Sequence, residues 1–143
     1  MGLAHQTLLL WAARRMHADG YVVAGFDGTA PQGGNWNLLR APFKLGGHRP
    51  DAWGMTPDGA LLAFAEAKTA ADILNRHTLE QLRIFGAVRM KAGSKPCALY
   101  VAVPREQAPK LDAALNAAGL LNAAHIIRMH VPEALLRDGR HAA

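Results

Sequence analysis

The order of segments in the last third of the chain most constrains the fold. An apolar run at 97–103 indicates a buried strand. A helical pattern follows at about 107–118, and a second strand is expected at His125–Val131. Two strands joined by a helix pair in parallel through a right-handed crossover. The chain is therefore expected to be an α/β protein whose helices cover a sheet.

The first part of the chain adds an antiparallel section, so the sheet is expected to be mixed. Thr56-Pro57-Asp58-Gly59 is a strong turn signal, and it predicts that a strand through Asp51–Met55 folds back onto Ala60–Lys68. The expected order is αβββαβαβ in a single domain over residues 1–143. The remaining elements are a helix at Leu3–Ala18, a strand at Tyr21–Phe26, a further candidate strand at Trp36–Phe43, a helix at about Thr78–Lys91 and a short helical tail.

Two acids and a lysine are expected to meet in this hairpin. Side chains alternate along a strand, so Glu66 and Lys68 share a face with Leu62 and Phe64. The antiparallel return places Asp51 across from them. Two adjacent carboxylates repel each other unless a cation lies between them, and their hard oxygen atoms suit Mg²⁺. The hairpin therefore predicts a divalent-metal site.

Pro50-Asp51 followed by Glu66-Ala67-Lys68 resembles the motif of the PD-(D/E)XK nuclease superfamily. Gln81 on the next helix is similar to the glutamine of small nucleases of the VRR-NUC and Holliday-junction-resolvase-like types. The pattern extends over about residues 1–104, and its specific residues lie in the stretch from Arg49 to Leu82. The resemblance implies a restriction-endonuclease-like fold, with a mixed sheet flanked by helices. It also implies cleavage of DNA.

The resemblance gives each residue of the motif an expected role. Asp51, Glu66 and the backbone carbonyl of Ala67 would hold Mg²⁺, for which Mn²⁺ can substitute. Lys68 would orient the attacking water or stabilise the phosphorane. Gln81 would position the water or the phosphate. The expected protein is a Mg²⁺-dependent endo- or exodeoxyribonuclease.

The hairpin residues also have simpler interpretations. Asp51 could be a strand-end residue that accepts backbone hydrogen bonds, since aspartate is depleted inside strands. Glu66 and Lys68 could form a same-face pair on a solvated sheet surface. The shared face with Leu62 and Phe64 favours a covered surface, where a Glu and a Lys need partners.

Gln81 has an alternative role and a competing neighbour. Thr78-Leu79-Glu80-Gln81 matches a capping box, in which Thr78 caps the helix and Gln81 reaches back to its N–H. Glu80 is an acid one position away, turned by about 100° around the helix from Gln81. Only one of the two can face the hairpin, and Gln81 is favoured.

The first helix departs from the family pattern. Related nucleases often place a metal-binding glutamate there, whereas this chain has His5 and Gln6 and no acid before Asp19. Either side chain can contact a metal-bound water or a phosphate, but neither supplies negative charge. His5 is otherwise a plain residue of the helix surface.

Four further residues are candidate nucleic-acid contacts. His48 and Arg49 precede Pro50-Asp51 and could touch phosphate, although a solvated loop explains them as well. Arg76 and Arg83 are seven residues apart and share a helical face if the helix extends that far. Such a run is usually a solvated face, but beside a metal site it becomes a candidate phosphate track.

Composition agrees with this function without deciding it. The net charge of +5 is the sign expected of a protein that meets phosphate backbones. The single cysteine, Cys97, excludes an internal disulfide framework and fits a reducing cytoplasm. No apolar stretch approaches a membrane span, so no membrane partner is expected. A domain of this size often dimerises to cut two strands, which makes a homodimer one expected assembly.

Three functions follow from these residues. The first is a metal-dependent DNA nuclease in repair, recombination, restriction or phage DNA processing. The second is a nucleic-acid-binding module of the same fold with weak or lost catalysis, which the missing acid of the first helix supports. The third is a non-enzymatic interaction or assembly protein in which the two acids and the lysine are incidental.

Overall fold

The protein is built on one five-stranded mixed sheet with helices on both faces. The computed structural model describes residues 2–27 and 41–137 of the 143-residue chain. The strands lie in the order β1-β2-β3-β4-β5, with β1, β2 and β3 antiparallel and β3, β4 and β5 parallel. The elements are α1 (Leu3–Ala18), β1 (Val22–Phe26), β2 (Ala52–Met55), β3 (Leu62–Ala67), α2 (Arg76–Gly86), β4 (Ala98–Pro104), α3 (Ala108–Ala117), β5 (Ile126–Val131) and α4 (Glu133–Arg137), with short 3-10 helices at Ala70–Asp72 and Arg105–Gln107.

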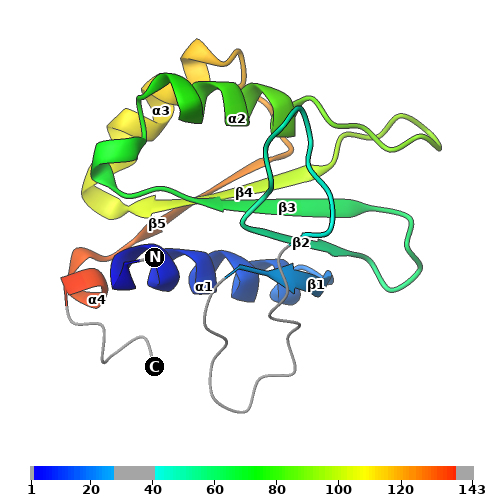
Figure 1. The fold of residues 1–143 in the computed structure, drawn as a ribbon, viewed down its shortest axis with the longest axis horizontal. Helices are drawn as coiled ribbons and strands as arrows, with labels where there is room; N and C mark the ends of the chain where they lie inside the picture. The colour runs from blue at the N-terminus through cyan, green and yellow to red at the C-terminus, as the bar shows by residue number, and fades with distance from the viewer. Residues whose placement is uncertain (1, 28–40, 138–143) are drawn as a thin grey trace.

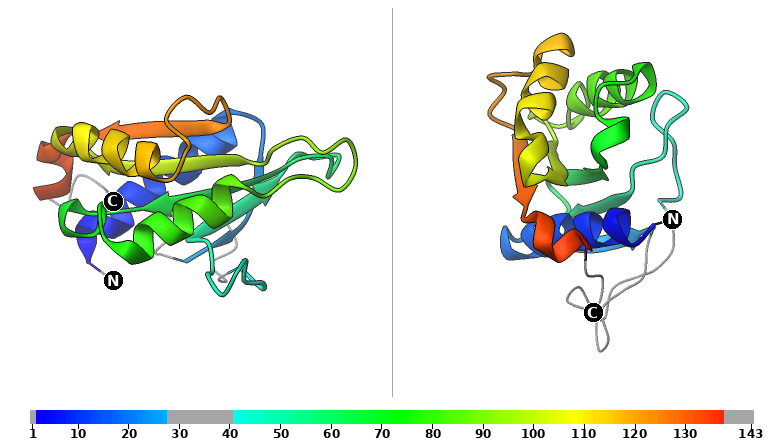
Figure 2. Two further views of the ribbon diagram at one scale, coloured as in Figure 1. Left: turned by 90° about the horizontal axis from the view of Figure 1, so that it is seen from above. Right: turned by 90° about the vertical axis from the view of Figure 1, so that its left-hand side faces the viewer.

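The molecule has three layers. Helices α1 and α4 lie below the sheet in Figure 1, and α2 and α3 lie above it. The side view in Figure 2 shows the same arrangement, with the strands between the two helical layers. The α/β class and the mixed sheet flanked by helices, expected from the sequence, are confirmed.

The alternation of side chains along β3 explains why two helical layers form. Ala63, Ala65 and Ala67 are buried against the α1 side, where Leu8 and Leu9 of α1 are also fully buried. Three small side chains on one face let a helix approach the strand closely. The other face carries Phe64, which packs with buried side chains of α2, β4 and α3. These two apolar clusters hold the hairpin between them.

The β2–β3 hairpin forms where the turn residues predict it. The Thr56 N–H donates to the Leu61 carbonyl (2.9 Å), and Gly59 has a φ of 72°, which only glycine adopts without strain. On the outer side of the hairpin, β1 approaches β2 closely at Gly54. A Cβ at Gly54 would lie 2.5 Å from the Val22 carbonyl oxygen, so this strand pairing depends on glycine.

Two expected elements differ in the structure. The helix predicted at about Thr78–Lys91 runs instead from Arg76 to Gly86. It begins two residues earlier than predicted because Asn75 is its N-cap, and the Asn75 side chain accepts a hydrogen bond from the Thr78 N–H. It ends at Gly86, after which the chain turns. A Cβ at Gly86 would meet the Leu120 side chain at 2.6 Å.

The candidate strand at Trp36–Phe43 lies mostly outside the described residues, and its described part, 41–43, is not a strand. None of the helices in the described ranges is long and apolar enough to cross a bilayer.

Candidate functional site

Strand register brings Asp51 and Glu66 together. Ala52 pairs with Ala65, which places Asp51 directly across from Glu66 at the end of the hairpin. The Asp51 N–H donates to Glu66 Oε1 (3.1 Å), and the Ala67 N–H donates to Asp51 Oδ2 (3.0 Å). Asp51 therefore does accept a backbone hydrogen bond, as its simpler interpretation expects. It does so beside a second acid.

Glu66 is a buried carboxylate with an incomplete set of partners. Its side chain is 1% exposed, and Oε2 accepts no hydrogen bond but lies 3.6 Å from Lys68 Nζ. Burial raises the pKa of Glu66 well above its ordinary value, and the charge of Asp51 raises it further. Lys68 opposes this shift without cancelling it. The interpretation of Glu66 and Lys68 as a solvated surface pair is therefore wrong.

Helix α2 completes the surroundings of Lys68. The Lys68 ammonium donates a hydrogen bond to the side-chain oxygen of Gln81, which is 7% exposed. The neighbouring Glu80 points elsewhere, with its carboxylate 3.3 Å from His48 Nε2. Of the two candidates on α2, the structure thus turns Gln81 toward the hairpin.

The capping-box interpretation of Gln81 is wrong. Asn75 caps α2, so Thr78 lies inside the first turn and its hydroxyl donates to the Asp72 carbonyl. The Gln81 side chain is free of a capping role because the helix begins at Arg76. It bonds to Lys68 instead.

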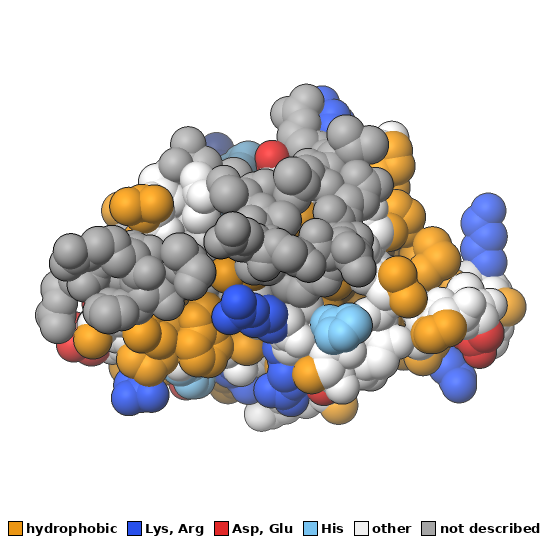
Figure 3. All heavy atoms as spheres, turned by 90° about the horizontal axis from the view of Figure 1, so that it is seen from below, with side chains coloured by type: hydrophobic (Ala, Val, Ile, Leu, Met, Phe, Trp, Pro, Cys, Tyr) orange, Lys and Arg blue, Asp and Glu red, His pale blue; other side chains and the backbone are white. Residues whose placement is uncertain are grey.

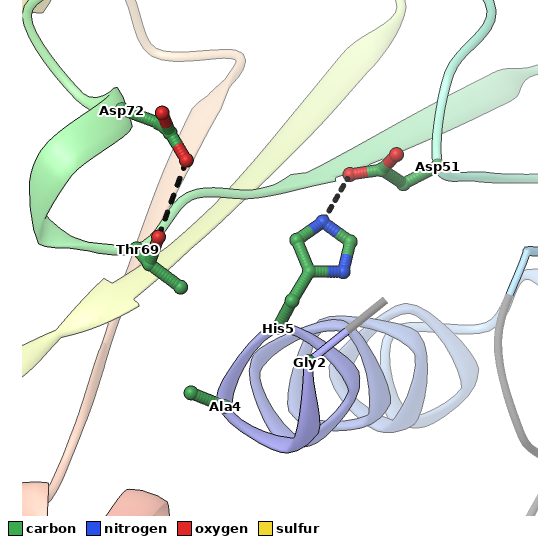
Figure 4. Close-up of a pocket in the computed structure, with 6 residues that line it drawn as sticks. All are labelled: Gly2, Ala4, His5, Asp51, Thr69 and Asp72. Carbon is green, nitrogen blue, oxygen red and sulfur yellow. Dashed lines mark hydrogen bonds and ion pairs between the residues drawn. The ribbon is translucent and has the colours of Figure 1, made fainter.

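Helix α1 brings a histidine to the other side of Asp51. His5 Nε2 lies 3.4 Å from Asp51 Oδ2, and His5 Nδ1 is buried without a hydrogen-bond partner among the described residues. His5 and Asp51 line an open hollow of about 480 Å³, whose other lining residues are Gly2, Ala4, Thr69 and Asp72. Figure 4 shows the imidazole pointing from α1 to the Asp51 carboxylate.

Thr69 and Asp72 of this hollow were not expected from the sequence. They follow Lys68 directly, where the chain leaves β3 for a short 3-10 helix, and the Thr69 hydroxyl lies 3.3 Å from an Asp72 carboxylate oxygen. The sequence signal for these two residues is a polar pair, three positions apart, that follows the strand carrying Glu66. That spacing is common in loops, and it does not point to a site on its own.

The donor set fits a hard divalent cation that keeps several waters. Within residues 2–27 and 41–137, no three His, Cys, Asp or Glu side chains converge as a complete metal site. Asp51 and Glu66 supply two carboxylates, and Mg²⁺ is commonly bound through one or two carboxylates and water. The buried Oε2 of Glu66, which accepts no hydrogen bond, is a position where a cation would compensate the carboxylate.

Two of the other candidate contacts, Arg49 and His48, are engaged with residues outside the hairpin. Arg49 donates to the Ala41 carbonyl, and His48 is only 10% exposed and packs against His77 and Phe85. The expectation that His48 is a solvated loop residue is therefore wrong. Gln6 lies next to His5 on α1 and is half-buried.

Arg76 and Arg83 do share a face of α2, since the helix includes both. That face is turned by about 140–160° from Gln81, and Arg83 donates to the Ala117 carbonyl (3.1 Å) at the end of α3. The structure therefore turns this face of α2 away from Gln81, and contact of these arginines with nucleic acid stays a prediction.

Comparisons with protein-family models, with curated proteins and with solved structures gave no match for this chain.

Proposed function

We propose that the protein is a metal-dependent nuclease that hydrolyses phosphodiester bonds of DNA. The observation that carries the proposal is the pair of facing carboxylates, Asp51 and Glu66, one of them buried beside an ammonium group. A buried carboxylate that faces a second acid is unfavourable without a compensating cation. The mixed sheet with helices on both faces is also the architecture that the resemblance to PD-(D/E)XK nucleases implies.

In this proposal each residue around the β2–β3 hairpin has its own role. Asp51 and Glu66 hold Mg²⁺ or Mn²⁺, and the Ala67 carbonyl is the third expected ligand. A bound divalent ion supplies a water of lowered pKa and positive charge against the scissile phosphate. Lys68 donates a hydrogen bond to the phosphate oxygens and so stabilises the negative charge that develops on them. Gln81 accepts from Lys68 and so fixes the direction of the ammonium group.

A second candidate is a nucleic-acid-binding module of the same fold with weak or lost catalysis. Two observations favour it: α1 brings His5 rather than an acid to Asp51, and no three ligating side chains converge in the described part of the chain. Such a module would bind DNA with a steep salt dependence and would cut nothing. A homodimer and a cytoplasmic location stay predictions, and the first is measurable by light scattering.

The test is cleavage of linear and branched DNA by the purified protein, with Mg²⁺, with Mn²⁺ and with chelator. Asp51→Asn and Lys68→Met should each abolish cleavage, while Glu80→Gln, one position from Gln81 and turned away from the hairpin, should retain it. Metal-independent cleavage, or cleavage that survives both site substitutions, would exclude the proposal. Salt-dependent binding without cleavage in any metal would establish the second candidate.

A further inference from the structure

A basic hairpin projects from the sheet at the end opposite α4. This segment, residues 88–97, links α2 to β4 and extends beyond the strands at the right of Figure 1. Arg89 forms a bridge with Pro96, and the Met90 N–H donates to the Lys95 carbonyl (2.8 Å). The excursion is thus held as a hairpin of defined shape.

The tip of the basic hairpin is a tight reversal stabilised from within. Gly93 and Ser94 both have positive φ, 77° and 53°. The Arg89 guanidinium donates to the Ser94 carbonyl (2.9 Å) across the loop. On the inner side, the buried Cys97 thiol lies 3.6 Å from the Met90 sulfur. Arg89 therefore stabilises the loop, whereas the other two cations, Lys91 and Lys95, are exposed to solvent.

The remaining cations of the basic hairpin have no internal role. Both lysines are exposed, and the ammonium groups of Lys91 and Lys95 make no hydrogen bond or ion pair with any residue in the described ranges. The sequence contains no acid between Glu80 and Glu106. Blue side chains project at the right-hand end of Figure 3, the end where the basic hairpin lies in Figure 1. The β2–β3 turn, at the same end of the sheet in Figure 1, carries one acid, Asp58.

The register of the sheet sets the distance from this hairpin to the candidate site. Ala98 pairs with Ala63, three residues along β3 from Glu66, and Lys95 lies three residues before Ala98. At about 3.3 Å per residue, the Lys95 backbone lies roughly 20 Å from Glu66 along the strands. A DNA duplex carries one charge per about 1.7 Å of its axis, so this distance corresponds to about six base pairs.

We propose that the basic hairpin is a second nucleic-acid contact, in which Lys91 and Lys95 bind backbone phosphates about six base pairs from the cut site. The inference rests on the proposed function for its partner, a DNA duplex. Lysines contact phosphate as point charges and read no sequence, so the hairpin adds affinity without specificity. The ordered loop also lowers the entropy lost when the two ammonium groups are positioned.

The experiment measures duplex binding over a range of salt concentrations, in chelator so that nothing is cut. We expect Lys91→Ala/Lys95→Ala to bind every duplex sequence more weakly, with the slope of log K against log[salt] smaller by about 1.8, or about 0.9 for each phosphate contact. The matched control, Arg14→Ala/Arg105→Ala, removes the same charge from two exposed positions, on α1 and in the 3-10 helix after β4, and should leave the slope unchanged.

Several outcomes would overturn the inference: an unchanged slope in the lysine variant, an equal fall in both variants, or lysine-dependent binding to anionic lipid vesicles instead of DNA. The outcomes also separate the two proposals. A smaller slope together with no cleavage in any metal contradicts the nuclease and leaves the hairpin contact in place. Metal-dependent cleavage with an unchanged slope contradicts only the hairpin contact.

Discussion

Glu66 is a buried acid whose charge is opposed both by burial and by Asp51, and its pKa is raised accordingly. An acid whose pKa is higher in the folded than in the unfolded state adds stability that is complete below its unfolded pKa of about 4.3, and that is lost as the pH rises through the folded value. In the presence of a chelator, raising the pH above the ordinary pKa of a glutamate should therefore lower the melting temperature of the wild type relative to Glu66→Gln, which has no charge to bury. A parallel pH dependence of the two proteins would contradict the shift.

The same residue predicts how metal affects stability. Mn²⁺ at about a hundred times its Kd should stabilise the wild type by about 2.7 kcal/mol, since it binds only the folded state. Glu66→Gln removes a carboxylate ligand and should show no such gain, whereas Glu80→Gln, exposed on α2, should show the full gain. Thermal unfolding with and without Mn²⁺ measures both. Equal stabilisation of Glu66→Gln would place the ion elsewhere.

Gln81 holds Lys68 rather than a helix end, and this gives a second residue-level prediction. Gln81→Leu fills similar space but leaves the Lys68 ammonium without its acceptor, which should cost about 1.5–3 kcal/mol in the free energy of unfolding. Cleavage should fall by about tenfold or more, because Lys68 is no longer fixed. Urea unfolding and cleavage rates measure the two effects. A capping role would instead predict an effect on helix content with Lys68 undisturbed.

The sequence could indicate which residues meet at this site but not how each is held. The alternation along β3 and the turn at 56–59 were enough to place Glu66 across from Asp51. The partner of Gln81 was ambiguous, because Thr78 and Gln81 match a capping box as well as they match a site. The position of the N-cap at Asn75 decides between a capping role and a site role for Gln81. The start of α2 depends in turn on where the chain leaves β3.

Helix α1 is the element whose sequence departs from the pattern of the nucleases that the hairpin motif resembles, and its position nevertheless reaches the site. His5 lies in its first turn, where an acid would also interact favourably with the helix dipole. We expect His5→Glu to add a third carboxylate beside Asp51 and to tighten Mn²⁺ binding by about tenfold, while the apo protein loses stability through like-charge repulsion. Calorimetric titration measures the affinity.

Leu3→Glu is the control for this substitution. It adds the same charge to the same helical turn at a side chain that is 65% exposed. Its metal affinity should match the wild type. If both variants tighten binding equally, the effect comes from overall charge, and His5 does not face the ion.

Elements with strong local signals were predicted well, and those that depend on tertiary contacts were not. The periodic apolar positions of α1 gave its bounds, Leu3–Ala18, as they are in the structure. The end of α2 was predicted too late, because residues after Gly86 retain helix-forming composition. The chain leaves the helix there to form the basic hairpin, and Leu120 occupies the space beside Gly86. Nothing local in the sequence indicates that contact.

The candidate site draws on both helical layers of the protein. His5 comes from α1 on one side of the sheet, Gln81 comes from α2 on the other, and the hairpin lies between them. Leu9 of α1 and Leu111 of α3 are both buried, but they belong to separate apolar clusters. Helix α3 contributes no residue to the site among those described, so α1 and α3 should differ in how their packing affects activity.

Leu9→Ala and Leu111→Ala should each lower the free energy of unfolding by about 2–5 kcal/mol, the usual range for a buried leucine. Measured well below both melting temperatures, cleavage should fall in Leu9→Ala, because a cavity under α1 lets His5 and Asp51 shift, and should be nearly unchanged in Leu111→Ala. Urea unfolding gives the stabilities, and single-turnover cleavage gives the rates. Equal losses of rate would mean that activity follows global stability, and that the α1 layer has no particular role in holding the site.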